Sequence, residues 1–196
     1  MSVFTTEHFD ALFTKAHTEH GFLPQEVPQE LLQQAVDMAL LGPTAFNCLP
    51  MRIVFVKSAE GKEKLSACLM EGNRQQTAEA AVTAIICFDE EYQEQLPKTM
   101  PFVPGAKDYF PPGTDGHKGA MLRNGNLQAG YFIMALRALG LGCGPMSGFS
   151  NDAVDAAFLA DTKWKSNFLI NIGYPVVEKR YPRAPRLSFE EATKLA

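Results

Sequence analysis

The chain of 196 residues has the length of one domain, and its content of 46% hydrophobic and 20% charged residues is typical of a globular protein with a buried core. The formal net charge of −4 gives no general basic excess for neutralising nucleic-acid phosphates, so any cationic chemistry must be local. The first residues lack the basic and apolar regions of a signal peptide, and no apolar run approaches the roughly 20 residues of a membrane-spanning helix. We therefore expect one domain over residues 1–196, located in the cytoplasm.

The cysteines and histidines argue against a metal site. No C-x-x-C pair occurs, and scattered cysteines favour reduced thiols over a disulfide framework or zinc. His17 and His20 have a spacing that is compatible with chelation, but no further histidine or cysteine lies close to them in the sequence. We predict no metal, and four free thiols: Cys48, Cys68, Cys87 and Cys143.

Apolar spacing predicts the elements of the first half of the chain. Gly42-Pro43 is expected to end the second helix, because neither residue continues a helix well. In chain order we expect an amphipathic helix over 4–17, a helix over 28–40, a buried strand over 52–57, a helix over 60–70 and a buried strand over 82–88.

The segment 97–116 carries five prolines and three glycines, interleaved with aromatic residues. A stretch of this length without regular structure is uncommon in a compact domain and is often a lid or binding loop. The alternative is an ordered surface excursion with a short helix of its own. The sequence leaves both interpretations open.

The longest helix is predicted over 117–139, with Gly140 in the left-handed position that ends many helices. Its interior glycines, Gly119, Gly125 and Gly130, each cost about 1 kcal/mol relative to alanine. They indicate either a close approach by another backbone or a flat ligand, or tight packing within the subunit. A third buried strand is expected over 167–173. Because no βαβ unit of normal length occurs, an α+β fold is favoured over a doubly wound sheet.

Two glycine-containing segments could contact a ligand. The run 140–148 is not a dinucleotide fingerprint, because Ser147 stands where a glycine is needed and the run follows a helix rather than a strand. Its glycines could instead let backbone N–H groups approach a flat ligand. In the second segment, 42–50, Thr44 and Asn47 are suited either to a polar ligand or to bonding their own backbone.

The C-terminal tail is locally basic. Its prolines favour an extended path with three residues per turn, which would place Arg180, Arg183 and Arg186 on one face. Guanidinium groups match phosphate oxygens, although a solvated tail would have the same composition. Ser188-Phe-Glu-Glu191 is a capping box and predicts a short final helix.

The order of these segments resembles the nitroreductase superfamily of FMN enzymes. The matching motifs are P-T-A-F-N-C-L-P, A-L-G-L-G-C-G-P-M-S-G, and I-G-Y-P followed by the basic tail. More narrowly, R-I-V-F, S-A-E-G-K-E-K-L, K-S-N-F-L-I-N-I-G-Y and P-R-L-S-F-E-E-A resemble the malonic semialdehyde reductase branch, associated with uracil breakdown. Leu49-Pro50-Met51, in place of the common Q-P-W, agrees with that branch.

The resemblance implies an α+β fold with a central, mostly antiparallel sheet flanked by helices, and an interlocked homodimer with FMN at the subunit interface. Met146, Ser147 and Gly148 would face the flavin ring, and Arg183 and Arg186 would hold its phosphate. His17 stands where the family usually has an arginine, which implies weaker or pH-dependent phosphate binding. The complete set of implied cofactor-binding residues is His17, Thr18, Thr44, Ala45, Asn47, Gln76, Met146, Ser147, Gly148, Arg183 and Arg186.

The implied activity is ping-pong transfer of hydride from NADPH or NADH, through flavin N5, to malonic semialdehyde, giving 3-hydroxypropionate. A cation should meet the substrate carboxylate, and Arg52, Arg123 and Lys165 are candidates of equal standing. The sequence identifies no proton donor. Two alternatives are a broad nitroaromatic and quinone reductase, and a flavin-binding protein without turnover.

Overall fold

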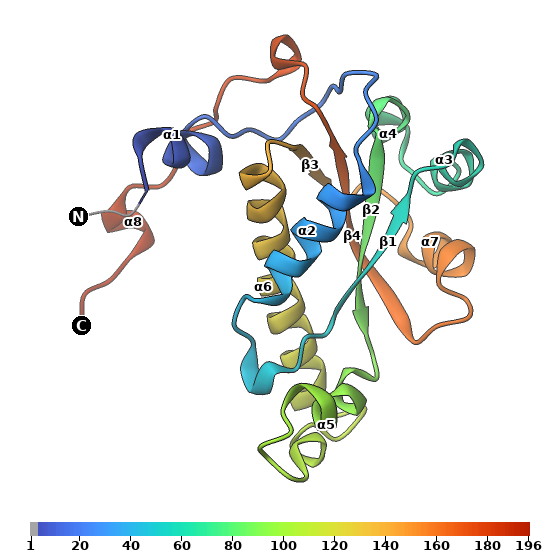
Figure 1. The fold of residues 1–196 in the computed structure, drawn as a ribbon, viewed down its shortest axis with the longest axis vertical. Helices are drawn as coiled ribbons and strands as arrows, with labels where there is room; N and C mark the ends of the chain where they lie inside the picture. Colours follow the sequence, from blue (N-terminus) through green and yellow to red (C-terminus); the bar gives the residue numbers. More distant parts are fainter. Residues whose placement is uncertain (1–3) are drawn as a thin grey trace.

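A four-stranded sheet forms the centre of the computed structural model, which describes residues 4–196 (Figure 1). Its strands are β1 (Met51–Val56), β2 (Val82–Asp89), β3 (Gly142–Met146) and β4 (Trp164–Gly173), in the order β1-β2-β4-β3. All three pairings are antiparallel, and the central strand β2 is buried along its whole length. The predicted α+β class with an antiparallel sheet flanked by helices is confirmed.

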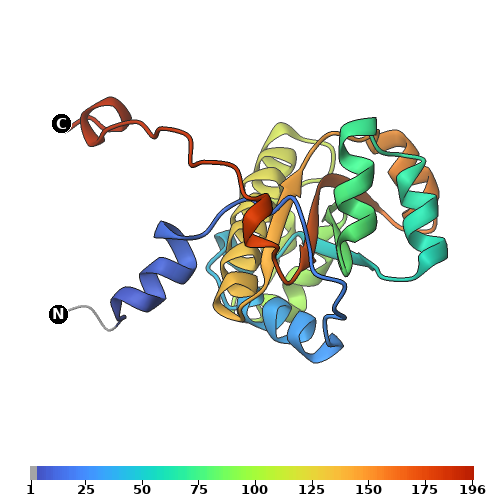
Figure 2. The same ribbon diagram turned by 90° about the horizontal axis from the view of Figure 1, so that it is seen from above.

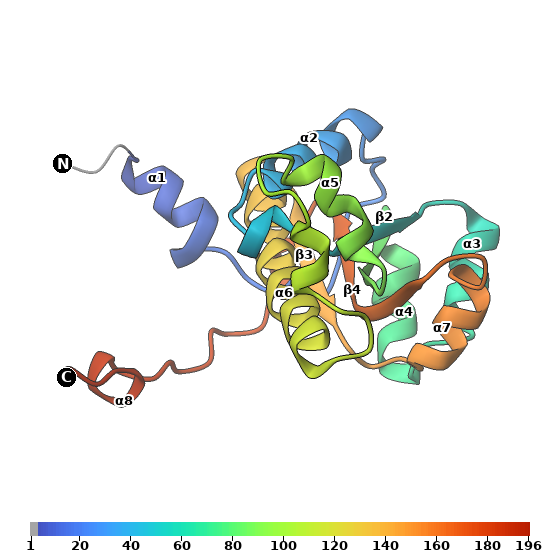
Figure 3. The ribbon, with the colours of Figure 1, turned by 90° about the horizontal axis from the view of Figure 1, so that it is seen from below.

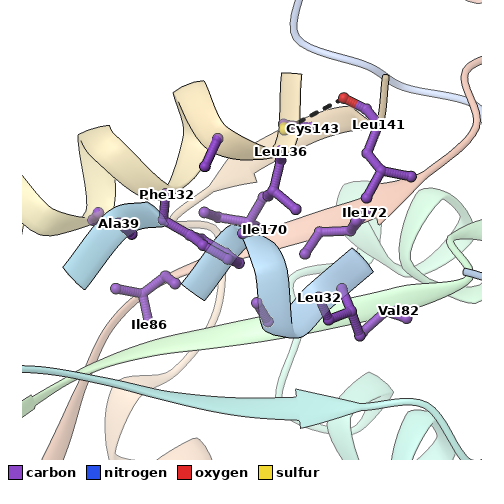
Figure 4. Close-up of a cluster of buried hydrophobic side chains, with 14 of the residues drawn as sticks. Leu32, Ala39, Val82, Ile86, Phe132, Leu136, Leu141, Cys143, Ile170 and Ile172 are labelled. Carbon is purple, nitrogen blue, oxygen red and sulfur yellow. Dashed lines mark hydrogen bonds between the residues drawn. The ribbon is translucent and has the colours of Figure 1, made fainter. Parts of the chain in front are cut away.

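One face of the sheet is covered by α2 (Gln29–Leu40) and α6 (Asp115–Ala138). Both helices present an apolar side to the strands, and burial of such side chains is the main force that holds the layers together. Figure 4 shows side chains of α2 and α6 meeting those of β2, β3 and β4 in this core. Its labelled members include Leu32, Ala39, Ile86, Phe132, Leu136, Ile170 and Ile172.

The other face carries α3 (Ala59–Ser66), α4 (Glu71–Glu79) and α7 (Asn151–Phe158). Leu65 and Val154 bring α3 and α7 into a second buried cluster. The helix predicted over 60–70 is therefore too long, and α4 and α7 were not predicted. The sequence of α4, EGNRQQTAE, has almost no apolar residues, so it shows no helical periodicity.

The long helix α6 ends as predicted. Gly140 has a φ of 78°, its N–H donates to Arg137 O, and Leu141 N–H donates to Leu136 O, which together form a Schellman motif. Of the two interpretations of its interior glycines, tight packing within the subunit applies at Gly125. A Cβ at Gly125 would lie 2.4 Å from the Phe88 ring, so an aromatic side chain of the same chain makes the close approach.

Gly119 and Gly130 of α6 differ from Gly125. Within residues 4–196, nothing lies within 4 Å of a Cβ built at either position. For these two glycines, the expected close approach is therefore not made by any described part of the same chain.

The proline-rich segment 97–116 is an ordered surface excursion, the second of the two interpretations. It contains the end of α5 (Leu96–Thr99) and a 3-10 turn at Ala106–Tyr109, and it lies at the N-terminal end of α6 (Figure 3). Leu96 and Ala106 are buried in a third apolar cluster, which holds the segment against the body of the protein.

Both ends of the chain leave the body on the same side (Figures 2 and 3). The first helix is shorter than predicted: α1 (Thr6–Phe9) continues as a π-helical turn at Asp10–Thr14. The predicted capping box is present at the start of α8 (Phe189–Ala192). Several large apolar side chains of these arms are exposed, among them Phe9, Phe13, Leu187 and Phe189. Among the described residues, no helix has the length and apolar character needed to cross a membrane.

Candidate functional site

The glycine-rich run after α6 forms the edge strand β3, which was not predicted. It pairs with β4 from Gly142↔Gly173 to Met146↔Leu169. A Cβ at Gly142 would lie 2.9 Å from Glu19 Cγ, and one at Gly144 would lie 2.5 Å from Glu19 O. At these two positions the glycines admit the neighbouring segment of the chain.

A basic pocket lies between the N-terminal segment and the C-terminal tail. Its cavity volume is about 470 Å³. It contains four of the predicted site residues, His17, Thr18, Arg183 and Arg186, which are far apart in the sequence. We use the name basic pocket for the cavity lined by Phe13, Ala16, His17, Thr18, His20, Arg137, Tyr181, Pro182, Arg183, Ala184 and Arg186.

Within residues 4–196, the guanidinium groups of the basic pocket donate to backbone carbonyls and to the thioether of Met134. Arg183 Nη2 donates to Phe13 O, Thr14 O and Ala16 O at 3.3, 3.0 and 2.6 Å. Arg186 Nη1 donates to the two preceding carbonyls, and Arg137 Nη1 to Leu12 O. Within residues 4–196 none of the three forms a salt bridge. Their positive charge is thus available to an anion such as a phosphate.

Arg180 does not join the other two arginines of the tail. Its guanidinium forms a salt bridge with Glu19, which is 3% exposed. The hydrogen bond to Glu19 raises the pKa of Arg180 above its ordinary value. The prediction that three arginines share one face is therefore wrong at Arg180. The buried carboxylate of Glu19 requires a charged partner, and Arg180 is that partner.

A polar cluster borders the basic pocket. Gln76 Nε2 donates to Asn73 Oδ1 at 2.7 Å and approaches Met146 Sδ at 3.7 Å. Asn73 Nδ2 in turn donates to Gly148 O at 2.9 Å. The structure thus brings together Gln76, Met146 and Gly148 of the predicted site, and Ser147 between them is exposed.

His20 connects the basic pocket with this cluster. Its Nδ1 lies 3.1 Å from Gln76 Oε1, and its ring meets the Tyr181 ring edge-on at a centroid distance of 4.8 Å. From the sequence, His20 was a candidate for metal ligation alone. The signal that could have identified it is its position three residues after His17, in an extended segment where both side chains can reach one cavity.

The turn with Thr44, Ala45 and Asn47 is held by the body of the protein. Ala45 N–H donates to Asn124 Oδ1 at 2.8 Å, and Asn47 Nδ2 donates to Thr99 O at 2.7 Å. Asn47 has a φ of 51°, and Phe46 and Leu49 are also left-handed, at 53° and 42°. Such values are uncommon for residues other than glycine and require support from surrounding contacts.

This turn lies far from the basic pocket of the same chain. Ala45 is fixed to Asn124 in the first half of α6, whereas Arg137 of the pocket lies in the last turn. At the usual rise per residue, these two positions are about 20 Å apart along the helix axis. One chain therefore joins the predicted residues of the N-terminal segment, α4, β3 and the tail, but not those of the 44–47 turn.

Metal ligation and thiol chemistry have no support in the described part of the chain. No group of three or more histidine, cysteine, aspartate or glutamate side chains there is arranged to hold a metal ion. The four cysteines are free, and burial raises the pKa of Cys48 to about 11 and that of Cys87 and Cys143 to about 12. These three thiols remain protonated near neutral pH.

The chain belongs to the Nitroreductase family, whose profile matches residues 14–174. It is 46% identical to a Cupriavidus pinatubonensis protein, over 98% of this chain and 99% of the relative. It is 50% identical to a Stenotrophomonas maltophilia protein, over 95% of each chain. Both relatives are provisionally named NADH dehydrogenase/NAD(P)H nitroreductase.

Solved structures agree with this assignment at the level of the fold. A provisionally named nitroreductase from Exiguobacterium sibiricum, solved in complex with FMN, superimposes with a TM-score of 0.83. The superposition covers 100% of both chains at 19% sequence identity. At this identity the similarity shows a shared fold alone.

Proposed function

We propose that this protein is an FMN-dependent oxidoreductase that takes hydride from NADPH or NADH. The observation that carries the proposal is the basic pocket, whose arginines form no salt bridge within residues 4–196 and which is connected through His20 to the cluster around Gln76 and Met146. Bound FMN would supply hydride transfer at its N5 atom, so no nucleophilic side chain is needed. The FMN complex of the Exiguobacterium sibiricum protein and the names of the relatives support the same cofactors.

Each part of the pocket has a proposed task. His17, Thr18, Arg183 and Arg186 would hold the phosphate, since guanidinium forks and small polar groups match its oxygens. Gln76 and residues 146–148 would line the flavin ring. Asn73 connects the two, because it accepts a hydrogen bond from Gln76 and donates one to Gly148 O, and this holds Gln76 and the backbone at Gly148 in fixed positions.

We infer that the functional unit is a homodimer. The 44–47 turn is hydrogen-bonded to Asn124, about 20 Å along the α6 axis from Arg137 of the basic pocket, so we expect it to contribute to the flavin site of a second copy. An open, apolar surface of α6 is available for that contact. It is lined by Arg123, Asn126, Leu127, Gly130, Tyr131, Ile133 and Met134.

The proposed substrate is malonic semialdehyde, reduced to 3-hydroxypropionate. Two of the three candidate cations are already paired: Arg52 with Asp89 at 2.6 Å and Lys165 with Asp155 at 3.5 Å. Arg123 is exposed and has no salt bridge within residues 4–196. It is therefore our candidate for binding the substrate carboxylate across the dimer.

Replacing Arg123 tests this assignment. In Arg123→Gln we expect KM for malonic semialdehyde to rise about tenfold or more, because a charge-assisted hydrogen bond is lost. KM for an uncharged quinone should remain unchanged, and Lys165→Gln is the matched control. Equal effects on both acceptors would contradict the assignment.

The second candidate is a reductase of nitroaromatics and quinones; the word nitroreductase in the names of the relatives favours the first of these two substrate classes. Steady-state oxidation of NADPH and NADH, measured with malonic semialdehyde, a nitroaromatic and a quinone in turn, separates the two. A kcat/KM highest for the semialdehyde, with 3-hydroxypropionate as product, supports the first candidate. FMN binding without turnover of any acceptor would instead indicate a non-catalytic flavoprotein.

We also propose a cytoplasmic location, which the four free thiols support.

A further inference from the structure

A buried ion pair connects the two ends of the described chain. Arg180 Nε donates to Glu19 Oε1 and Oε2 at 3.1 and 2.9 Å, and Arg180 Nη2 donates to Glu19 Oε1 at 2.7 Å. The Glu19 side chain is 4% exposed and that of Arg180 23%. A carboxylate buried to this degree requires a partner, because transfer out of water disfavours the unpaired charge.

The backbone around Glu19 is fixed to the sheet. Thr18 forms a parallel bridge with Cys143, and Glu19 N–H donates to Cys143 O at 2.9 Å. Gly142 and Gly144 of β3 leave the space that Glu19 occupies. The carboxylate is therefore a fixed point on the edge of the sheet, and Arg180 is the group that is attached to it.

The Glu19–Arg180 pair adjoins both chain segments that line the basic pocket. His17 and Thr18 directly precede Glu19, and Arg183 and Arg186 follow Arg180 by three and six residues. Neither Glu19 nor Arg180 lines the pocket itself. Beyond Arg180 and within residues 4–196, the tail contacts the rest of the chain through Arg183, which donates to carbonyls of the N-terminal segment, and through the Tyr181 ring, which meets the His20 ring. The Glu19–Arg180 pair thus ties the start of the tail to the edge of the sheet.

We propose that Glu19 and Arg180 are positioning residues for the flavin phosphate, an inference that rests on the proposed FMN function. Their bidentate salt bridge fixes the distance between the segment that carries His17 and the segment that carries Arg183 and Arg186. Arg180 also neutralises Glu19, so that no unpaired carboxylate repels the phosphate. The role is specific to the phosphate end, because the pair lies outside the cluster proposed to line the ring.

The test compares two flavins that differ only in the phosphate. Dissociation constants of FMN and riboflavin are measured by quenching of flavin fluorescence, for wild type, Arg180→Gln, Glu19→Gln/Arg180→Gln and Arg180→Lys. We expect the preference for FMN over riboflavin to fall about tenfold or more in Arg180→Gln, which leaves the Glu19 carboxylate unpaired. The double variant, which replaces the ion pair by two amides, should recover part of that preference, and so should Arg180→Lys.

A merely structural role gives a different pattern. In that case both flavins lose affinity by the same factor, and the preference stays as in wild type, which overturns the proposal. Lys179→Gln, which removes the neighbouring surface salt bridge to Glu79, is the control and should leave the preference unchanged. If Arg180→Gln does not fold, as judged by its circular dichroism melt, the double variant and Arg180→Lys decide, because both avoid a buried unpaired charge.

The proposed function and this inference fail in distinguishable ways. Wild type that binds neither flavin contradicts the FMN function itself. Wild type that prefers FMN, with the same preference in every Arg180 variant, contradicts only the positioning role.

Discussion

The two arginines of the tail that line the basic pocket differ in how much of the fold depends on them. Arg183 donates to three carbonyls of the N-terminal segment and so attaches that segment to the tail. In the described part of the chain, Arg186 bonds only to the carbonyls of Ala184 and Pro185, its own neighbours. Removing Arg186 therefore changes the charge of the pocket and little else.

For this reason Arg186→Ala should lose flavin without losing stability. We expect its FMN dissociation constant to rise about tenfold, the usual effect of one charge-assisted bond, while the melting temperature of the apoprotein stays as in wild type. Arg183→Ala should lower both. The measurements are flavin content by absorbance and apoprotein melting by calorimetry. Unchanged flavin content in Arg186→Ala would remove the phosphate role of this residue.

His117 is a buried histidine outside the proposed site. It is 4% exposed, its ring stacks on Tyr92 at 4.7 Å, and its Nε2 lies 2.8 Å from Gln93 Oε1. Burial lowers the pKa of His117 below its ordinary value, and the charge of Lys118 adds to this, whereas that of Glu90 acts in the opposite direction. His117 is therefore neutral in the folded protein at a pH where the unfolded chain already binds a proton.

The sign of the pH effect follows from linkage. Above the ordinary histidine pKa of about 6.5, both states are neutral and His117 makes no pH-dependent contribution. As the pH falls below that value, the unfolded chain gains a proton first, so stability decreases. We expect His117→Gln to show a smaller drop in melting temperature than wild type between about pH 8 and about pH 5. An equal drop would show that burial of His117 has no such consequence.

At the scale of elements, periodic apolar patterns predicted well where they were long. The helix over 117–139 and the three apolar strands lie within a few residues of their predicted bounds. The edge strand β3 could not be predicted, because its five residues include two glycines and a proline, and its pairing depends on β4. The polar helix α4 was missed because tertiary packing, not periodicity, stabilises it.

The glycines of β3 give the prediction that belongs to this scale. In Gly144→Ala the new Cβ would meet Glu19 O at 2.5 Å, so the strand or the 18–20 segment must shift. We expect a loss of about 1–3 kcal/mol of stability, as for other overpacked sites, together with weaker FMN binding. Gly119→Ala is the matched control: nothing lies near its Cβ, and alanine favours the helix. Denaturant unfolding of both variants tests this, and equal stabilities would contradict the close approach.

At the scale of the whole molecule, the sequence motifs indicated candidate site residues but did not predict which of these residues lie together in one cavity. His17 and Arg186 share a pocket because the N-terminal segment and the tail both run past β3, a relation that no local pattern contains. The 44–47 motif was equally clear in the sequence, yet its turn lies at the other end of α6. We propose that assembly of two chains brings these positions into one site.

A charge on the open surface of α6 tests that assembly. Gly130→Arg should fold, because nothing lies within 4 Å of its Cβ and arginine favours a helix more than glycine does. We expect it to sediment as a monomer and to lose FMN. Ala156→Arg, on α7 across the sheet, is the control and should remain a dimer. A dimeric Gly130→Arg would exclude this surface as the interface.

The most direct test of the central claim is an anaerobic visible spectrum of the purified protein, titrated first with NADPH and then with malonic semialdehyde. We expect an oxidised-flavin spectrum that is bleached by NADPH and restored by the aldehyde. Bleaching without restoration would support a flavin enzyme but exclude malonic semialdehyde as its acceptor, which leaves nitroaromatics and quinones as candidates. A colourless protein that cannot be reconstituted with FMN would contradict the account.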